Sequence, residues 1–316
     1  MKNLKNIKKF KIFLTRVLKS LFSFSGYFFG LLFIFFPRDI ILKFMFFLSN
    51  RTKIFNFLFY NFNQASFRLI KFKFGSSYIA SKKLVSGSEI KLDITKNTQR
   101  QMYFWKIYEP HITNFLVDNL KKGDWSVDIG ANIGYHTLLM SDFVGENGKV
   151  FAFEPEELNF TNLKENINHS NKKNIIAEKM AIGSEDNLVR LNINPHNEGG
   201  HSLVPDYSGK EGIMVKVVRL DNYFKNLSLE EIQRIKSVKI DVEGFELEVF
   251  IGMNRLLESA SSLSVICEIS RNKREILEIM KKIGYSPFLL NNDGTASFLE
   301  DDFVYRSSKR DILFTR

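Results

Sequence analysis

The sequence predicts an α/β protein with a mostly parallel sheet, helices on both faces, and a preceding segment of different composition. From about residue 100, short apolar runs alternate with amphipathic helical patterns. Strands and helices that alternate at this spacing are typical of βαβ units. Residues 1–75 differ, because they hold 14 Lys and Arg against one acid, Asp39, and 19 of the 32 Phe.

The first 80 residues are expected to attach the chain to a membrane surface. "MKNLKNIKKFKIFLTRVLKS" carries seven Lys and Arg and precedes an uncharged run, residues 21–36. Sixteen helical residues reach about 24 Å, short of a hydrocarbon core of about 30 Å. A tilted single span stays open, but interfacial or re-entrant helices are preferred because Phe-rich faces with flanking cations suit the headgroup zone. A signal peptide is disfavoured because no small-residue cleavage site follows; a helical subdomain that covers part of the core is the alternative.

The remaining residues have the composition of an ordinary globular protein. They hold 31 basic and 34 acidic residues, which argues against a nucleic-acid-binding face. The single cysteine, Cys267, excludes an intrachain disulfide framework and a Cys-based zinc site, and its apolar surroundings in "LSVICEI" indicate a buried strand. The sequence does not indicate the oligomeric state.

Strand and helix patterns follow one another in the order expected of a βαβ protein. "DWSVDIG" is a strand and "GYHTLLMSDFV" a helix that ends at "GENGK"; "VFAFEP" is a strand and "EELNFTNLKENINHS" a helix; "NIIAEKMAIG" is a third strand. In residues 187–224, "LVRLNINP" and "IMVKVVRLDNYF" predict a β-hairpin inserted into the sheet unit. "VKIDVEGFELEVFIGM" then predicts a strand and helix, "LSVICEI" a strand, "NKREILEIMKKIGY" a helix, and "SPFLLNN" with "SFLEDDFVYR" a closing antiparallel pair.

The Gly-rich turn after the first of these strands points to a cofactor without phosphate. Its pattern is Asp128-x-Gly130-x-Asn132-x-Gly134, which lacks the middle Gly of a dinucleotide fingerprint and the Lys of a phosphate loop. Glu154 ends the next strand, where its carboxylate can accept both hydroxyls of an unphosphorylated ribose. Ligands of such sheets bind at the carboxyl ends of the strands. These features suit S-adenosylmethionine, whose sulfonium is positive.

Four motifs in the same order resemble the FkbM family of S-adenosylmethionine-dependent methyltransferases. They are "VDIGANIGYHT", "FAFEP", "VVRLDNYF" and "VKIDVEGFELEVFIGM", and the resemblance covers about residues 100–290. It implies the seven-stranded class I methyltransferase fold over residues 81–316 and O-methylation of a hydroxyl on a sugar, glycan or related natural product. Residues 1–80 lie outside the resemblance.

The resemblance also implies roles for individual residues. The turn would line the methionine end of the cofactor, Glu154 would hold the ribose, and the "MAIG" run would border the adenine. The expected cofactor-binding residues are Asp128, Gly130, Asn132, Gly134, Glu154, Ala181 and Glu109, the last from the "YEP" lead-in.

Three residues are candidates for the base that removes the acceptor proton: Asp241, Glu243 and His201. Asp241 and Glu243 lie on the same side of an extended chain, and Asp241 is expected beside the methyl group. Glu243 can instead cap the helix that follows. His201 lies in a polar loop and has a suitable ordinary pKa, although an exposed loop histidine is equally expected. No ligand spacing requires a metal.

Two other functions stay open. A nicotinamide-dependent, NAD(P)-type oxidoreductase fits a similar sheet, but the missing middle Gly counts against it; a non-catalytic, membrane-attached binding protein fits the fold, but the intact motif residues count against it. The acceptor is expected to be a small molecule or a glycan or lipid-linked group. The expected location is the cytoplasmic face of a membrane, with residues 1–75 on its surface.

Overall fold

The computed structural model describes residues 77–104, 107–194, 199–204, 212–300 and 311–316. The chain divides into two units. The described residues of the first unit are 77–80, 92–104 and 107–108. The described residues of the second unit are 81–91 and those from 109 onward. Residues 1–76 of the predicted membrane segment, 1–80, lie outside the described residues. In the part that the structure describes, no helix combines the length and apolarity needed to cross a membrane.

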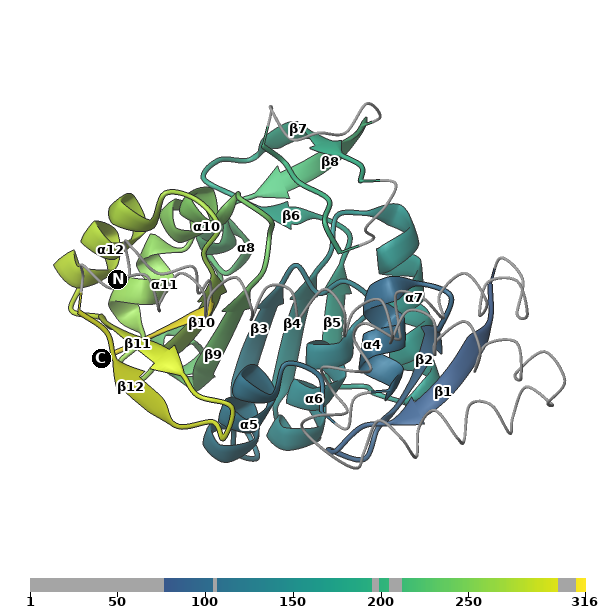
Figure 1. Cartoon of the computed structure of the whole chain (residues 1–316). Helices are drawn as coiled ribbons and strands as arrows, with labels where there is room; N and C mark the ends of the chain where they lie inside the picture. Colours follow the sequence, from purple (N-terminus) through teal and green to yellow (C-terminus); the bar gives the residue numbers. More distant parts are fainter. Residues whose placement is uncertain (1–76, 105–106, 195–198, 205–211, 301–310) are drawn as a thin grey trace, which may run out of the picture. The chain divides into compact units, whose positions relative to one another are not determined.

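The second unit is organised around a mixed sheet in which eight described strands pair in the order β12-β11-β13-β10-β9-β3-β4-β5 (Figure 1). The strands β3, β4, β5, β9 and β10 pair in parallel, and β13 runs antiparallel to both β10 and β11. The bounds are β3 Trp125–Ile129, β4 Lys149–Phe153, β5 Ile175–Glu178, β9 Ile235–Ile240, β10 Ser264–Glu268, β11 Ser286–Leu290, β12 Ala296–Phe298 and β13 Asp311–Thr315. The mostly parallel sheet is confirmed, whereas the number seven is wrong, because β12 pairs with the outer edge of β11.

Helices cover both faces of this sheet, as the alternation of side chains along β10 shows. Val265 and Cys267 belong to a core cluster with residues of α8–α12, while Ile266 between them packs in a cluster with residues of α5 and α6. Figure 1 shows the two helical layers. The helices are α5 Pro110–Asn119, α6 Tyr135–Val144, α7 Glu157–His169, α8 Leu220–Tyr223, α9 Leu229–Arg234, α10 Glu246–Gly252, α11 Asn254–Ser259 and α12 Lys273–Lys282.

The predicted hairpin insertion is part of a separate three-stranded sheet. β7 (Asn187–Asn192) and β8 (Gly212–Val218) pair antiparallel, and β6 (Ala181–Ile182) pairs in parallel with β8. The single strand predicted from "NIIAEKMAIG" is therefore two strands in different sheets. The chain turns between them, where the Met180 N–H donates to the Glu178 carbonyl at 3.0 Å.

The C-terminal end differs from prediction by one strand. The predicted antiparallel pair is present as β11 and β12, with Phe288 opposite Phe298. The strand β13 was not predicted, yet it lies between β10 and β11 and buries Ile312, Leu313 and Phe314. Three adjacent apolar residues give no periodicity of their own, so the sequence offered little signal for this strand.

A two-stranded sheet, β1 (Ile79–Lys83) and β2 (Glu89–Asp93), precedes the main sheet in the chain, and the boundary between the units passes through both strands. In the first unit, α4 (Asn97–Phe104) follows β2, and the Asp93 carboxylate accepts from the Tyr78 N–H and from the Thr95 hydroxyl and N–H. Asp93 therefore connects the residue before β1 to the turn that follows β2.

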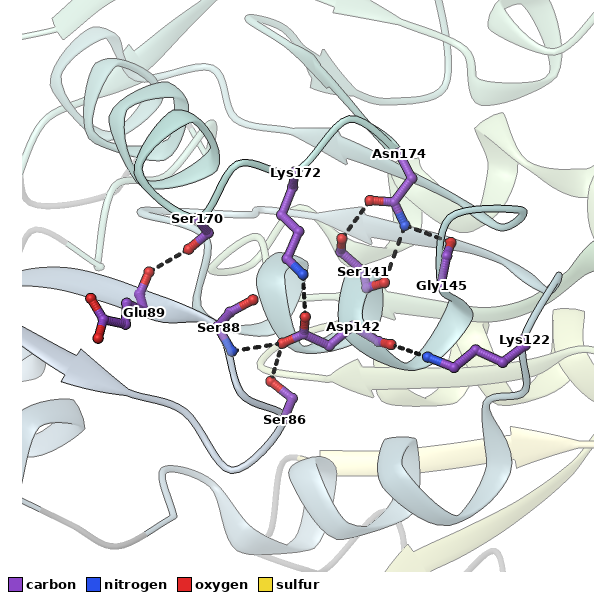
Figure 2. A network of polar contacts seen from close by, with 10 residues as sticks. All are labelled: Ser86, Ser88, Glu89, Lys122, Ser141, Asp142, Gly145, Ser170, Lys172 and Asn174. Carbon is purple, nitrogen blue, oxygen red and sulfur yellow. Dashed lines mark hydrogen bonds and ion pairs between the residues drawn. The ribbon is translucent and has the colours of Figure 1, made fainter.

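Within the second unit, Asp142 of α6 connects the turn between β1 and β2 to α6 and to Lys172 in the loop before β5 (Figure 2). Its Oδ2 accepts from the Ser86 hydroxyl and, at 3.1 Å, from the Ser88 N–H, while the Lys172 ammonium pairs with Oδ1. Asn174 donates to the Gly145 carbonyl at 2.8 Å in the same network. The two hydrogen bonds from Ser86 and Ser88 hold residues 86–88 on α6.

Candidate active site at the carboxyl ends of the strands

Asp128 lies at the end of a fully buried strand, β3, with its side chain 1% exposed. Its Oδ2 accepts from the Thr137 hydroxyl at 2.6 Å, and its Oδ1 has no hydrogen-bond donor among the described residues; the Lys239 ammonium lies 4.0 Å away. Burial raises the pKa of Asp128, and Lys239 and Thr137 oppose that rise. Oδ1 is therefore a buried oxygen that can accept a hydrogen bond from a cationic or N–H group of a ligand.

In the Gly-rich turn, Gly130 lies against the end of β9 without room for a side chain. Gly130 has φ of +81°, and a Cβ added there would lie 1.9 Å from the Asp241 carbonyl oxygen. The Asp241 N–H donates to the Ile129 carbonyl at 3.0 Å, which holds this approach. Gly134 has φ of +93°, and a Cβ there would lie 2.6 Å from Leu163 of α7. Both glycines are therefore favoured by conformation, and Gly130 is also required by its contact with backbone atoms.

Glu154, directly after β4, ties the turn to that strand. Its Oε2 accepts from the Asn132 N–H at 2.8 Å and its Oε1 from the Glu156 N–H at 3.0 Å. Asn132 adopts a left-handed φ of 50°. Burial raises the pKa of Glu154 to about 7, although both backbone hydrogen bonds oppose the rise. Each oxygen can accept a further hydrogen bond, so the expected contact of Glu154 with the ribose is compatible with this geometry. That contact stays a prediction.

The two remaining cofactor candidates occupy different places. Ala181 lies in β6, 6% exposed, opposite Val217 of β8. Glu109 precedes α5 with a left-handed φ of 43°, and its carboxylate lies 3.7 Å from Nε2 of His136. Burial raises the pKa of Glu109 to about 7, and the Lys239 charge opposes this. Glu109 is thus close to the charged groups at the strand ends.

Lys239, which the sequence interpretation did not select, is the central cation of the site. Its ammonium lies 3.3 Å from Asp241 Oδ2 and 4.0 Å from Asp128 Oδ1, and its side chain is 5% exposed. Burial lowers the pKa of Lys239, but the charges of Asp241, Asp128 and Glu109 outweigh it and the net shift is upward. The signal was a lysine within the buried run "VKI", where a charge requires partners.

Glu268 and Asp311 were also missed, although each lies at the same edge of the sheet. Glu268 ends β10 and is paired in register with Asp311 of β13, whose Oδ2 lies 3.0 Å from His111 Nε2. Burial raises the pKa of Glu268 to about 8, with further rises from the charges of Asp241 and Asp311. The signal was present, since "LSVICE" ends in an acid just as "VFAFE" does.

The other two predicted base candidates lie in the turn after β9 and in the insertion. The Glu243 carbonyl accepts from the Ser202 hydroxyl at 2.6 Å, and Glu243 has a left-handed φ of 49°. His201 Nδ1 accepts from the Asn194 N–H at 3.0 Å. Ser202 therefore fastens the insertion to the turn, while the hydrogen bond of His201 Nδ1 is made within the insertion. Base roles for Glu243, His201 and Asp241 stay predictions.

Glu246, at the start of α10, is fully buried and shapes this turn. Its Oε1 accepts from the Gly244 N–H at 2.7 Å and from the Ser270 hydroxyl at 3.1 Å. The N-cap position of this helix is Phe245, which makes no side-chain capping hydrogen bond, so Glu246 holds the turn before the helix and the capping role expected of Glu243 stays a prediction. Among the described residues, no three His, Cys, Asp or Glu side chains are arranged to hold a metal ion.

Comparison with known proteins identifies the same region. The model of the methyltransferase FkbM domain matches residues 128–287. The hexuronic acid methyltransferase AglP of Haloferax volcanii is 25% identical over 64% of this chain and 78% of its own length. The methyltransferase sdnD of Sordaria araneosa is 26% identical over 54% of this chain and 75% of its own.

Two solved structures are similar over much of the chain. TYW2 of M. jannaschii in complex with AdoMet has 13% identity and a TM-score of 0.40, and covers 76% of this chain and 86% of that protein. The SAM-dependent O-methyltransferase of Thermotoga maritima has 11% identity and a TM-score of 0.36, over 75% and 77%. Because both TM-scores are below 0.5, neither likeness carries an argument about the function of this chain.

Proposed function

The chain belongs to the FkbM methyltransferase family, and we propose that it transfers a methyl group to an oxygen atom of a sugar, glycan or related acceptor. The methyl donor is S-adenosylmethionine. The observation that supports the proposal is that Asp128 and Asp241 share Lys239 beside a turn with no room for a side chain at Gly130, with Glu268 at the end of the neighbouring strand β10. It combines a place for a cation with nearby carboxyl groups that can take up a proton.

The donor site is assigned to the Gly-rich turn because of its acceptors. A sulfonium with its α-ammonium group is cationic, and Asp128 Oδ1 is a buried acceptor without a hydrogen-bond donor among the described residues. A side chain at Gly130 would collide with the Asp241 backbone, so glycine at this position lets the turn and the end of β9 lie in contact. We assign the adenosine to the side of β4 and β6, where Glu154 and Ala181 lie.

The reaction needs alignment and removal of one proton. The acceptor oxygen attacks the methyl carbon, the new C–O bond forms as the C–S bond breaks, and the bonding pair returns to sulfur to give neutral S-adenosylhomocysteine. The proton of the acceptor hydroxyl passes to a base of the protein. Holding oxygen, carbon and sulfur in line supplies most of the acceleration, and a positioned base contributes roughly 10²–10⁴-fold.

A sugar acceptor is favoured by the relative that acts on hexuronic acid. A hexuronic acid offers hydroxyl oxygens and a carboxylate oxygen. The carboxylate carries no proton to remove, so the proton-accepting groups at this edge favour a hydroxyl.

The test is product analysis with the full chain in mild detergent. Donor labelled with ¹³C in the methyl group is mixed with a hexuronic acid glycoside, a neutral hexose glycoside and a primary amine. We expect a sugar product heavier by one labelled CH₂ unit that survives mild alkali, as an ether does and an ester does not. Labelled amine only, or an alkali-labile product only, would refute hydroxyl methylation.

We further propose that residues 1–75 hold the enzyme at the cytoplasmic face of a membrane, beside a membrane-proximal or lipid-linked acceptor. The support is their charge, 14 basic residues against one acid, and their 19 Phe. A reporter protein fused to residues 1–80 should sediment with vesicles containing anionic lipid, and less with vesicles of neutral lipid alone. A reporter that stays in the supernatant would refute attachment through this segment.

A further inference from the structure

A row of hydroxyl side chains crosses the main sheet near the amino ends of its parallel strands, away from the methyl-donor edge. Ser126 of β3 is paired in register with Ser237 of β9, and Ser237 with Ser264 of β10. The antiparallel register of β10 and β13 brings Thr315 next to Ser264. Paired residues of neighbouring strands point to the same face of a sheet, so these hydroxyls lie side by side on one face.

This face is the one that α5 covers, and a cavity lies there. Ile266, two residues after Ser264 in β10, packs in one cluster with residues of α5, and side chains two positions apart in a strand share a face. The cavity has a volume of about 310 Å³, and its lining includes Phe115, Leu116, Ser237, Ser264 and Thr315. Small-molecule sites span about 300–1,000 Å³, whereas one water occupies about 30 Å³, so this cavity can hold a small ligand.

Ser237 brings an unused hydroxyl to this cavity. The residue is 2% exposed, and its Oγ has no hydrogen-bond partner among the described residues. A hydroxyl can donate one hydrogen bond and accept two, and a buried hydroxyl without a partner is unfavourable. Ser237 therefore favours a ligand that carries oxygen or nitrogen atoms.

Lys236 lies on the cavity at an irregularity of β9. Trp125 of β3 is opposite Ile235. The next residue of β3, Ser126, is opposite Ser237, so Lys236 is an extra residue of β9 without an opposite residue in β3. Extra residues of this kind redirect side chains locally. Lys236 and Ser237, although adjacent in the strand, both line the cavity.

The charges around the cavity favour an anion. Lys121, Lys236 and Arg316 line it together with one described carboxylate side chain, Asp124. The Lys236 ammonium donates to the Ser262 hydroxyl at 3.4 Å, which is a neutral partner. The Arg316 guanidinium donates to two backbone carbonyls, at 3.0 and 2.9 Å, and retains further N–H donors. The Asp124 carboxylate accepts from the Lys121 N–H at 2.8 Å.

We propose that this cavity binds the phosphate group of a small phosphorylated sugar, with Lys236 on the phosphate and Ser237 beneath it. Lysine is a common phosphate ligand because its charge is compact, and a phosphate ester offers strong acceptor oxygens to the ammonium and to the hydroxyl. The sugar hydroxyls suit Ser264 and Thr315, and its C–H groups suit the apolar wall of α5. This inference does not rest on the proposed function.

The experiment is calorimetric titration of the full chain in mild detergent, with S-adenosylhomocysteine in excess so that the methyl-donor edge is filled. The titrants are glucose 6-phosphate, glucose and inorganic phosphate. We expect glucose 6-phosphate to bind saturably, inorganic phosphate to bind more weakly because it leaves part of the cavity unfilled, and glucose to give no saturable heat.

Variants then locate the binding. Lys236→Met should weaken binding of glucose 6-phosphate at least about tenfold, and Lys236→Arg should keep most of the affinity because the charge remains. Ser237→Ala should weaken it roughly three- to tenfold without lowering the unfolding free energy of the unliganded protein, because the hydroxyl has no partner there to lose. A merely structural role of Ser237 would instead lower that free energy.

Two matched controls should bind as the wild type does. Ser126→Ala removes a hydroxyl that is also buried and without a hydrogen-bond partner among the described residues, but Ser126 does not line the cavity. Lys282→Met removes an exposed lysine of α12. Asp241→Asn, at the methyl-donor edge, should also leave the affinity for glucose 6-phosphate unchanged.

The inference is overturned if glucose 6-phosphate gives no saturable heat, or if glucose binds equally well. It is also overturned if Lys236→Met and Ser237→Ala bind as the wild type does, or if Asp241→Asn abolishes binding, since the ligand would then lie at the methyl-donor edge. If Lys236→Met does not fold, Ser237→Ala decides. Failure of methyl transfer would refute the proposed function and leave this inference standing.

Discussion

Replacing Gly130 with alanine tests the close contact between the Gly-rich turn and Asp241. The residue has φ of +81°, and an added Cβ would lie 1.9 Å from the Asp241 carbonyl oxygen and 2.9 Å from its carbon. Both neighbours are backbone atoms, so no side chain can rotate away. The left-handed conformation should cost roughly 1–2 kcal/mol, and the forced separation about 1–3 kcal/mol more.

Gly284→Ala is the matched control for this variant. Gly284 has φ of +88°, and an added Cβ there would meet nothing within 4 Å. It should therefore show only the conformational cost of about 1–2 kcal/mol. The difference between the two variants isolates the contact with Asp241.

Chemical denaturation gives the loss of unfolding free energy, and calorimetry gives the affinity for S-adenosylhomocysteine. We expect Gly130→Ala to be the less stable variant by about 1–3 kcal/mol and to bind at least about tenfold more weakly, because Asp241 must move away from the turn. Gly284→Ala should bind as the wild type does. Equal stability and equal affinity of the two variants would refute the reasoning.

Buried charges give three further predictions. Lys239→Met should lower the unfolding free energy by about 3–5 kcal/mol, because Asp128 and Asp241 lose their shared cation; a loss below about 1 kcal/mol in denaturation would contradict this. The pKa of Glu154 is raised by burial to about 7, above the ordinary 4.5, so its stabilising contribution is fully present below about pH 4.5 and lost as the pH rises through 7. Relative to Glu154→Gln, the wild type should lose up to about 3 kcal/mol across this window, and the opposite sign in pH-dependent denaturation would refute the assignment. Asp142→Ala should speed amide exchange at Ser88 without changing cofactor affinity, because Asp142 accepts a hydrogen bond from that N–H. The control is Asp118→Ala, at an exposed position of α5. Unchanged exchange at Ser88 in Asp142→Ala would count against the role of Asp142.

Local patterns were sufficient for the elements that form the cofactor edge of the sheet. The strand that contains Asp128, the strand before Glu154 and the strand before Asp241 are buried at all or all but one of their positions, as expected of parallel strands covered on both faces. The rule that ligands bind at carboxyl ends then predicted that these three acids share one edge. Their placement around the Gly-rich turn follows that expectation, while their chemical roles stay predictions.

The pairing of strands that are distant in the chain could not be predicted from the sequence. Lys239 acquires its importance from being opposite Asp128, and Glu268 from lying between Asp241 and Asp311. These contacts depend on the order and register of strands separated by up to 183 positions in the chain, from Asp128 to Asp311, and register is not a local property. The same reason explains why β13 was missed, since its place between β10 and β11 comes from the sheet and not from its own three apolar residues.

The most direct test of the central claim is calorimetric titration of the full chain with S-adenosylhomocysteine, beside NADH and beside the Asp128→Asn variant. The carboxyl edge of the sheet should bind S-adenosylhomocysteine saturably, Asp128→Asn should bind it more weakly because the acceptor charge is lost, and NADH should give no saturable heat. Saturable binding of NADH, or equal affinity of wild type and Asp128→Asn for S-adenosylhomocysteine, would contradict the assignment of this edge as the methyl-donor site.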